Sequence, residues 1–231
     1  MTLRPRQDRG TLPWEPDVYG QSHLGAPLEV WRSSGPCHLL VFAAIHGEEG
    51  ETTSALSRAL RHLSEPSPHC AVVLAANPDG LSRGTRCNAR GVELNRNFPT
   101  ADWRPDPVMH RSTLDAPRDV ALSPGAAPGS EPETQAMIAL IQELKPEAVV
   151  ALHAPLACID DPNDSVLGRW LAARTGLPLV ADVGYPTPGS FGTWGAEQGL
   201  PVVTYEFGQT TPDGAATEHV PVLLGLLTQR I

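Results

Sequence analysis

Two histidines and two glutamates in this sequence have the types and spacing of a metal-dependent hydrolytic site. His46 and Glu49 follow one apolar run, His153 follows a second, and Glu206 follows a third. Catalytic zinc in hydrolases takes three protein ligands from histidine and acidic side chains and leaves one position for water. We hypothesise that His46 and Glu49 are two zinc ligands and that a distant strand supplies the third. A remaining carboxylate can then act as general base.

The spacing of His46 and Glu49 is weak evidence when it is taken alone. A His-x-x-Glu pattern arises often by chance, and a histidine at a strand end is more often a hydrogen-bonded structural residue. Glu48 or Glu51 could replace Glu49 as a ligand if spacing alone decided. The metal hypothesis therefore depends on whether the strand ends meet.

Buried strands are expected to bring these side chains to one edge of a sheet. Residues 39–45, 148–152 and 201–205 are apolar runs that suit strands buried on both faces. The carboxyl ends of such strands are where open α/β sheets place their ligand sites. A helix over 52–63 and a strand over 71–76 complete a right-handed βαβ unit.

The remaining pattern predicts a single α/β domain over residues 1–231, with a mixed, mainly parallel central sheet and helices on both faces. Ser130 and Glu133 form a capping-box pattern at the start of a helix that Lys145-Pro146 closes. Further elements are expected at 165–175 (helix), 177–180 (strand) and 215–227 (helix).

Three segments lack helical or strand periodicity. Residues 1–35 are predicted to be an irregular entry segment with a short edge strand at 28–31. Residues 100–129 are predicted to be a long, proline-rich loop, which could cover the site or be disordered. Residues 81–98 follow an Asn77–Gly80 turn and are rich in arginine. These arginines could serve a site, or they could lie on a solvated loop; they are Arg83, Arg86, Arg90 and Arg96.

Composition narrows the possible partners and location. Seventeen basic against twenty-six acidic residues give a net charge of −9, which opposes binding to nucleic acid and to anionic membranes. The amino terminus lacks the apolar region of a secretory signal, and no run is long enough to span a bilayer. The four cysteines are widely separated and are expected to be free thiols in a cytoplasmic protein.

Four motifs, in order, resemble the zinc carboxypeptidase family. They are His46-x-x-Glu49, Gly91-Val-Glu-Leu-Asn95-Arg96-Asn97-Phe98, His153, and Thr204-Tyr-Glu206-Phe. The resemblance extends roughly from Leu39 to Phe207. It implies that His46, Glu49 and His153 hold one Zn²⁺ ion per chain, and that Glu206 is the general base and proton shuttle.

The resemblance also implies roles around the metal. Arg86 matches the family's arginine that stabilises the oxyanion, and Asn95 with Arg96 matches the pair that binds the terminal carboxylate of the substrate. Tyr185 lies near the position of the family's mobile substrate-binding tyrosine. Within the family, the stretches 153–162 and 189–192 resemble bacterial enzymes that release meso-diaminopimelate from murein tripeptide during cytoplasmic cell-wall recycling. A small peptide is therefore the expected partner.

Three other functions are weighed against that expectation. A different zinc carboxypeptidase or deacylase, acting on other small peptides or acyl-amino acids, would share every ligand. A non-catalytic metal- or peptide-binding module would need neither Glu206 nor Arg86, so their presence disfavours it. A serine hydrolase centred on Ser190 is disfavoured because Gly189-Ser190-Phe191-Gly192 is not a G-x-S-x-G elbow.

Overall fold

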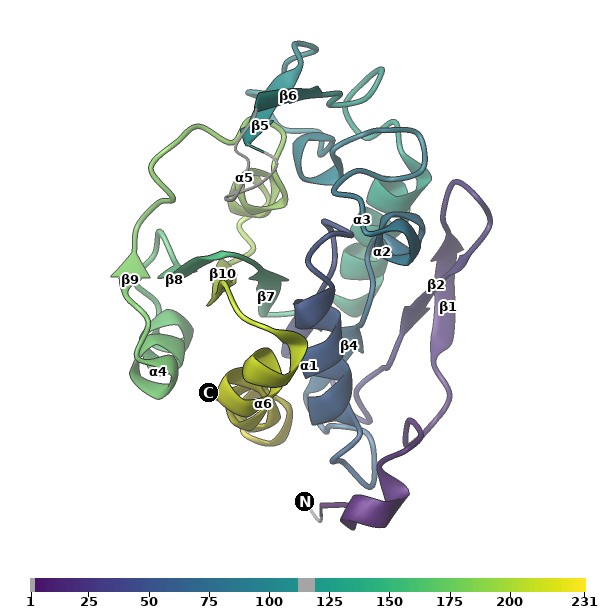
Figure 1. The fold of residues 1–231 in the computed structure, drawn as a ribbon, viewed down its shortest axis with the longest axis vertical. Coiled ribbons are helices and arrows are strands. Elements are labelled where there is room, and N and C mark those ends of the chain that lie inside the picture. The colour runs from purple at the N-terminus through teal and green to yellow at the C-terminus, as the bar shows by residue number, and fades with distance from the viewer. Residues whose placement is uncertain (1–2, 112–118) are drawn as a thin grey trace.

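Six strands form the central sheet of the computed structural model, which describes residues 3–111 and 119–231 (Figure 1). Their order across the sheet is β4-β3-β7-β10-β8-β9. The strands are β3 (Leu39–Phe42), β4 (Cys70–Val73), β7 (Ala148–His153), β8 (Leu156–Asp160), β9 (Leu179–Val180) and β10 (Val202–Gly208). Four of the five neighbouring pairs are parallel, and β8 with β10 is antiparallel. The prediction of a mixed, mainly parallel sheet is confirmed.

Helices cover both faces of this sheet. One face packs against α1 (Gly50–Leu60), α4 (Val166–Thr175) and α6 (Pro212–Thr228). The other packs against α3 (Pro132–Leu144) and α5 (Phe191–Glu197). Each face has its own apolar core, so a sheet of almost wholly apolar strands is buried on both sides.

Alternation along β10 decides which residues reach the site. Val203, Tyr205 and Phe207 lie in the core shared with α1 and α6. Because successive strand residues point to opposite faces, Thr204 and Glu206 lie on the face covered by α3 and α5. The single strand therefore anchors the core with one set of side chains and presents polar groups with the other.

The entry segment is more ordered than its composition suggests. The short 3₁₀ helix η1 (Arg6–Asp8) is followed by an antiparallel hairpin of β1 (Asp17–Gln21) and β2 (Pro27–Val30). The prediction that 1–35 is irregular was wrong for β1, although the expected edge strand overlaps β2. Strand β1 is mostly exposed and so shows no apolar run. It packs on α3 at Gly20, where a Cβ atom would lie 2.6 Å from that of Ala136.

The proline-rich segment also contains a hairpin. Strands β5 (Val108–Arg111) and β6 (Asp119–Leu122) pair antiparallel, so the prediction of a structureless loop over 100–129 was wrong there. Residues 112–118 of that predicted loop lie outside the described residues. The residues of β6 alternate between exposed and partly buried, which leaves no apolar run for the sequence to reveal.

Several short elements were not predicted. Asn77 does not simply turn the chain: its Oδ1 accepts the Gly80 N–H at 2.9 Å and begins α2 (Pro78–Arg83). The 3₁₀ helix η2 (Leu94–Arg96) interrupts the arginine-rich stretch. Helix α5 follows the glycine-rich loop, and β8 follows His153.

The capping box predicted for α3 was wrong. The helix begins at Glu131, which makes no side-chain cap, and the Ser130 hydroxyl donates to the Glu131 carboxylate at 2.8 Å. The Glu133 carboxylate instead accepts hydrogen bonds from the His23 N–H and the Asn88 side chain. The Ser130 hydroxyl also accepts a hydrogen bond from the Asn97 side chain, so both side chains that the local pattern assigned to the cap are engaged elsewhere.

Helix α6 packs against α1 along the sheet. It matches the predicted closing helix and begins three residues earlier, at a Thr211 cap. Among the described residues, no helix combines the length and apolarity needed to cross a membrane.

Replacing Leu223 with alanine should lower the free energy of unfolding by about 2–5 kcal/mol, because Leu223 is fully buried within the core beneath α6. Urea denaturation followed by circular dichroism measures this change. Leu24→Ala is the matched control, since Leu24 is 56% exposed, and it should alter stability by less than about 0.5 kcal/mol. Equal losses in both variants would contradict the proposed position of the core.

Candidate active site

The chain leaves β3 through a tight turn that carries His46 and Glu49. Ala44 takes a positive φ of 51°, and Glu49 is the residue from which α1 begins. Gly47 packs directly on α2, because a Cβ atom there would lie 2.1 Å from the Gly80 carbonyl carbon. This close contact fixes the turn, and with it the direction of both side chains.

The potential ligand atoms of His46, Glu49 and His153 form a buried cluster within 4.8 Å of one another. His46 Nδ1 lies 2.7 Å from Glu49 Oε1 and 3.1 Å from His153 Nδ1, which in turn lies 3.2 Å from Glu49 Oε2. A tetrahedral ion with bonds of about 2.0–2.1 Å separates its ligand atoms by about 3.3 Å. Two imidazole nitrogens and a carboxylate at these separations suit zinc.

Electrostatics in this cluster favour a bound cation. Burial disfavours the charged form of Glu49, but His46 and His153 lower its pKa to about 2. Burial and Arg86 would lower the pKa of His46, yet Glu49 and Glu93 raise it to about 9. The Glu49 carboxylate therefore stays ionised. A metal ion that replaces the protons of the cluster would supply the positive charge that balances it.

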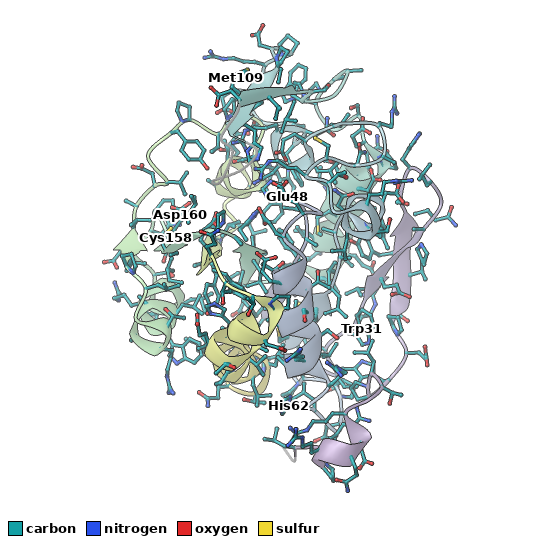
Figure 2. All side chains as sticks on the ribbon, in the orientation of Figure 1. Trp31, Glu48, His62, Met109, Cys158 and Asp160 are labelled. Carbon is teal, nitrogen blue, oxygen red and sulfur yellow. The ribbon has the colours of Figure 1, made fainter. Side chains whose placement is uncertain are left out.

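The structure separates Glu49 from the two acids that could have replaced it. The Glu48 carboxylate is partly exposed and lies 3.3 Å from Arg86 and 3.5 Å from His110, outside the ligand cluster. Glu51 lies in the first turn of α1 and is also outside it. Figure 2 shows Glu48 between α1 and the β5–β6 hairpin in this view.

Glu93 was missed by sequence reasoning, although it lies within one of the four motifs. It is 1% exposed, and its Oε1 lies 3.2 Å from His46 Nε2. The other oxygen accepts the Nε–H of Arg86. Burial would raise the pKa of Glu93, but His46 and Arg86 hold it well below the usual range. Glu93 thereby turns Nδ1 of His46 toward the ligand cluster.

Arg86 lies beside the cluster and is held by acids. Its Nη1 is 3.3 Å from Glu48 and 3.6 Å from Glu49. Burial would lower the pKa of Arg86, but Glu93, Glu49 and Glu48 together raise it. A permanently charged guanidinium is therefore fixed close to a predicted metal ligand.

Arg96 and Asn95 lie next to this group on η2. Arg96 is 5% exposed, and its Nε has no hydrogen-bond acceptor among the described residues. Burial lowers the pKa of Arg96 despite the opposing charge of Glu93. Asn95 Oδ1 accepts the Phe191 N–H at 2.8 Å and so ties η2 to α5. A buried guanidinium with an unused N–H is suited to an anionic ligand.

Glu206 lies on β10, the strand next to β7, and borders the ligand cluster. Parallel pairing puts it opposite His153, and its Oε2 accepts the Leu156 N–H at 3.3 Å. Burial raises the pKa of Glu206, and Glu49 adds to this while His153 opposes it. Tyr185 is 52% exposed in the loop before α5. Burial and Glu206 raise the Tyr185 pKa, whereas Arg96 opposes this, so the phenol lies within electrostatic reach of both groups.

Three residues that the sequence analysis named make structural contacts outside the ligand cluster. Ser190 caps α5, since its Oγ accepts the Thr193 N–H at 3.0 Å, and no histidine bonds to it within the described part of the chain. Arg83 donates to the Asp79 carbonyl in α2. Arg90 is half-exposed, 3.8 Å from Glu131. None of the three lies in the ligand cluster.

Sequence comparisons agree with this geometry. A family profile described as zinc carboxypeptidase matches residues 17–159. Murein peptide amidase A of Escherichia coli (strain K12) is 46% identical over 232 residues, covering 97% of this chain and 94% of that protein. Murein peptide amidase A of Vibrio campbellii (strain ATCC BAA-1116) is 40% identical over 230 residues, covering 98% of this chain and 93% of that protein.

Structure comparisons extend the likeness to the whole fold. The crystal structure of murein-tripeptide amidase MpaA from Escherichia coli O157 matches with a TM-score of 0.95 at 44% identity, covering 100% of this chain and 99% of that one. Carboxypeptidase A from Helicoverpa armigera shares the fold, with a TM-score of 0.68 at 19% identity over 91% of this chain and 67% of that one. From its sequence profile, its relatives and its buried ligand cluster, the chain belongs to the zinc carboxypeptidase family and is a zinc hydrolase.

Proposed function

We propose that this chain is a murein peptide amidase that hydrolyses the amide bond between γ-D-glutamate and meso-diaminopimelate in murein tripeptide. The observation that carries the reaction type is the buried cluster of His46, Glu49 and His153, with Glu206 beside it. The substrate is supported by the likeness, over nearly the whole chain, to proteins named murein peptide amidase A.

His46, Glu49 and His153 would hold the zinc ion, and Glu206 would move the protons. Zinc supplies a Lewis acid that polarises the scissile carbonyl and makes water a stronger nucleophile near neutral pH. The Glu206 carboxylate takes a proton from the attacking water and gives it to the nitrogen of the departing amine. Its raised pKa suits both halves of that transfer, because the protonated form is accessible after the first step.

Arg86 would stabilise the negative charge that develops on the carbonyl oxygen. Its Nε is engaged by Glu93 and its Nη1 by Glu48, so the guanidinium is oriented before substrate arrives. Groups fixed in advance stabilise a developing charge without paying for reorganisation. Glu93 and Glu48 are therefore positioning residues for Arg86.

Asn95 and Arg96 would bind the free carboxylate of the leaving residue. The Oδ1 of Asn95 is taken by Phe191, which leaves its amide nitrogen as the donor, and Arg96 has a buried N–H without an acceptor. Two such donors can hold a carboxylate in one orientation. Tyr185, on the loop before α5, would close over the substrate.

The proposal includes a cytoplasmic location and one catalytic unit over residues 1–231. Cys37, Cys70, Cys87 and Cys158 are all buried free thiols, which suits a reducing compartment. The candidate site residues lie between 46 and 206 and come from strands of a single sheet and the loops around it.

The substrate assignment is tested with zinc-loaded enzyme and a panel of peptides. L-Ala-γ-D-Glu-meso-diaminopimelate should be hydrolysed, and a chelator should abolish this activity until zinc is restored. The panel includes α-linked dipeptides and acyl-amino acids. Hydrolysis of those compounds without cleavage of the γ-D-glutamyl bond would instead support a different carboxypeptidase or deacylase.

Glu206→Gln should reduce kcat for the tripeptide by about 10²–10⁴-fold, because the amide cannot accept the proton of water. Zinc content, measured by elemental analysis, should remain that of the wild type, since Glu206 is not in the ligand cluster. Retained turnover would refute the proposed role.

Two further variants serve as controls for Glu206→Gln. Glu143→Gln removes an exposed carboxylate that pairs with Arg32 on the surface, and it should leave both kcat and zinc content unchanged. His153→Ala removes a member of the ligand cluster, and it should lower zinc content together with activity.

Arg96→Lys should lower kcat/KM for the tripeptide by about 10- to 100-fold, chiefly through KM, because an ammonium cannot reproduce the two-point hydrogen bonding of a guanidinium. A control peptide carries an amide in place of the α-carboxylate of its terminal residue. The wild type and Arg96→Lys should both cleave this peptide poorly and with similar kcat/KM. An equal loss on both peptides would show that Arg96 does not bind this carboxylate.

A further inference from the structure

Two consecutive acids at the end of β8 have different surroundings. Asp161 is buried and accepts hydrogen bonds from the Asn163 N–H and from the N–H and hydroxyl of Ser165, at the start of α4. The Oδ1 atom of Asp160 is also buried, yet no donor among the described residues bonds to it. The fold therefore explains Asp161 but gives the buried Oδ1 of Asp160 no partner among the described residues.

The register of the sheet places Asp160 beside the proposed general base. Asp160 pairs with Thr204, and Cys158 pairs with Glu206. Cross-strand partners share a face, so Asp160 and Glu206 are diagonal neighbours at about 7 Å. Figure 2 shows Asp160 and Cys158 close together on β8. Ile159, between them, points into the opposite core.

Charges around Asp160 are mostly of its own sign. Burial, together with Glu206, Asp182 and Asp161, raises the pKa of Asp160 to about 6 against the opposing effect of His153. Asp160 is partly buried, and a buried carboxylate oxygen without a donor or a cation is costly. An ammonium group from a ligand would supply both.

We propose that Asp160 binds an ammonium group on the side chain of the leaving residue and so selects substrates that carry one. This inference rests on the proposed function, in which the reacting amide lies at Glu206 and the leaving residue is a diamino acid. In meso-diaminopimelate, three methylene groups separate the two amino-bearing carbons, and the four bonds of about 1.5 Å between these carbons span about 5 Å in an extended zigzag. That reach suits a diagonal neighbour of Glu206 on the same face.

Asp160 is a specificity residue in this proposal, and a purely electrostatic role is the competing explanation. If Asp160 acted only by raising the pKa of Glu206, its replacement would change the hydrolysis of every substrate in the same proportion. Selective binding of an ammonium group changes only substrates that carry one. The two explanations therefore differ in selectivity.

The test compares two substrates, L-Ala-γ-D-Glu-meso-diaminopimelate and its analogue ending in 2-aminopimelate, which lacks the distal amino group. Asp160→Asn should lower kcat/KM for the first by about 10- to 100-fold, the range for a lost charge-assisted hydrogen bond, and change the second by less than about 3-fold. Asp160→Glu should recover part of the preference. Equal losses on both substrates would overturn the proposal.

Product inhibition gives a readout that needs no variant. Free meso-diaminopimelate should inhibit the wild-type enzyme about 10-fold or more better than 2-aminopimelate, and Asp160→Asn should remove this difference. Equal inhibition of the wild type would refute the proposal even if the variant failed to fold. Asp213→Asn is the matched control, because Asp213 pairs with Arg58 on the surface, and it should keep the wild-type preference.

Failure of the proposed function is distinguishable from failure of this inference. If the wild type cleaves neither γ-D-glutamyl substrate, the proposal that murein tripeptide is the substrate is wrong. Asp160 is then tested on α-linked peptides ending in lysine or in norleucine, which again differ by an amino group. Preference for lysine that disappears in Asp160→Asn would sustain the role of Asp160, and its persistence would overturn it.

Discussion

The parallel pairing of β7 with β10 is the constraint on which the site depends. It sets His153 opposite Glu206, so a predicted metal ligand and the proposed base are neighbours by backbone register. Strand β3 pairs with β7 on its other side and ends in the turn that carries His46 and Glu49. Each strand is held by apolar cores on both faces, so the polar groups at its end are carried on a rigid support.

Beside these strands, His46, Glu49, Arg86 and Glu93 alternate in charge, so that each of the four has a neighbour of opposite sign. Glu93 contacts both His46 and Arg86, and Glu49 faces both histidines of the cluster. Paired burial of this kind costs less than isolated burial and fixes side-chain directions. Arg96 and Asp160 each keep a buried atom without a partner. We assign a substrate contact to each of these two groups.

Much of this architecture could be predicted from the sequence because buried parallel strands are continuous apolar runs. The ends of β3, β7 and β10 are visible for that reason, and the order of the motifs then identifies the family. The strand expected at 28–31 overlaps β2, in which Leu28 and Val30 are buried. Strand β1 and the hairpin β5–β6 could not be found this way, since β1 and β6 are short and contain no fully buried residue. The roles of Glu93 and Asp160 were also hidden, because they arise from contacts and cross-strand register that no local pattern records.

The contact between Gly47 and Gly80 joins the turn that carries His46 and Glu49 to α2 with no side chain between them. Asn77, which caps α2, also donates to the carbonyls of Ile45 and Arg86, so the contact is part of a continuous hydrogen-bonded unit. Anything that binds the native turn and not the unfolded chain stabilises what is packed on it. Zinc bound by His46 and Glu49 would therefore also stabilise residues 77–87, which lie outside the sheet, and removal of the ion is expected to make that segment more accessible to proteases and to solvent exchange.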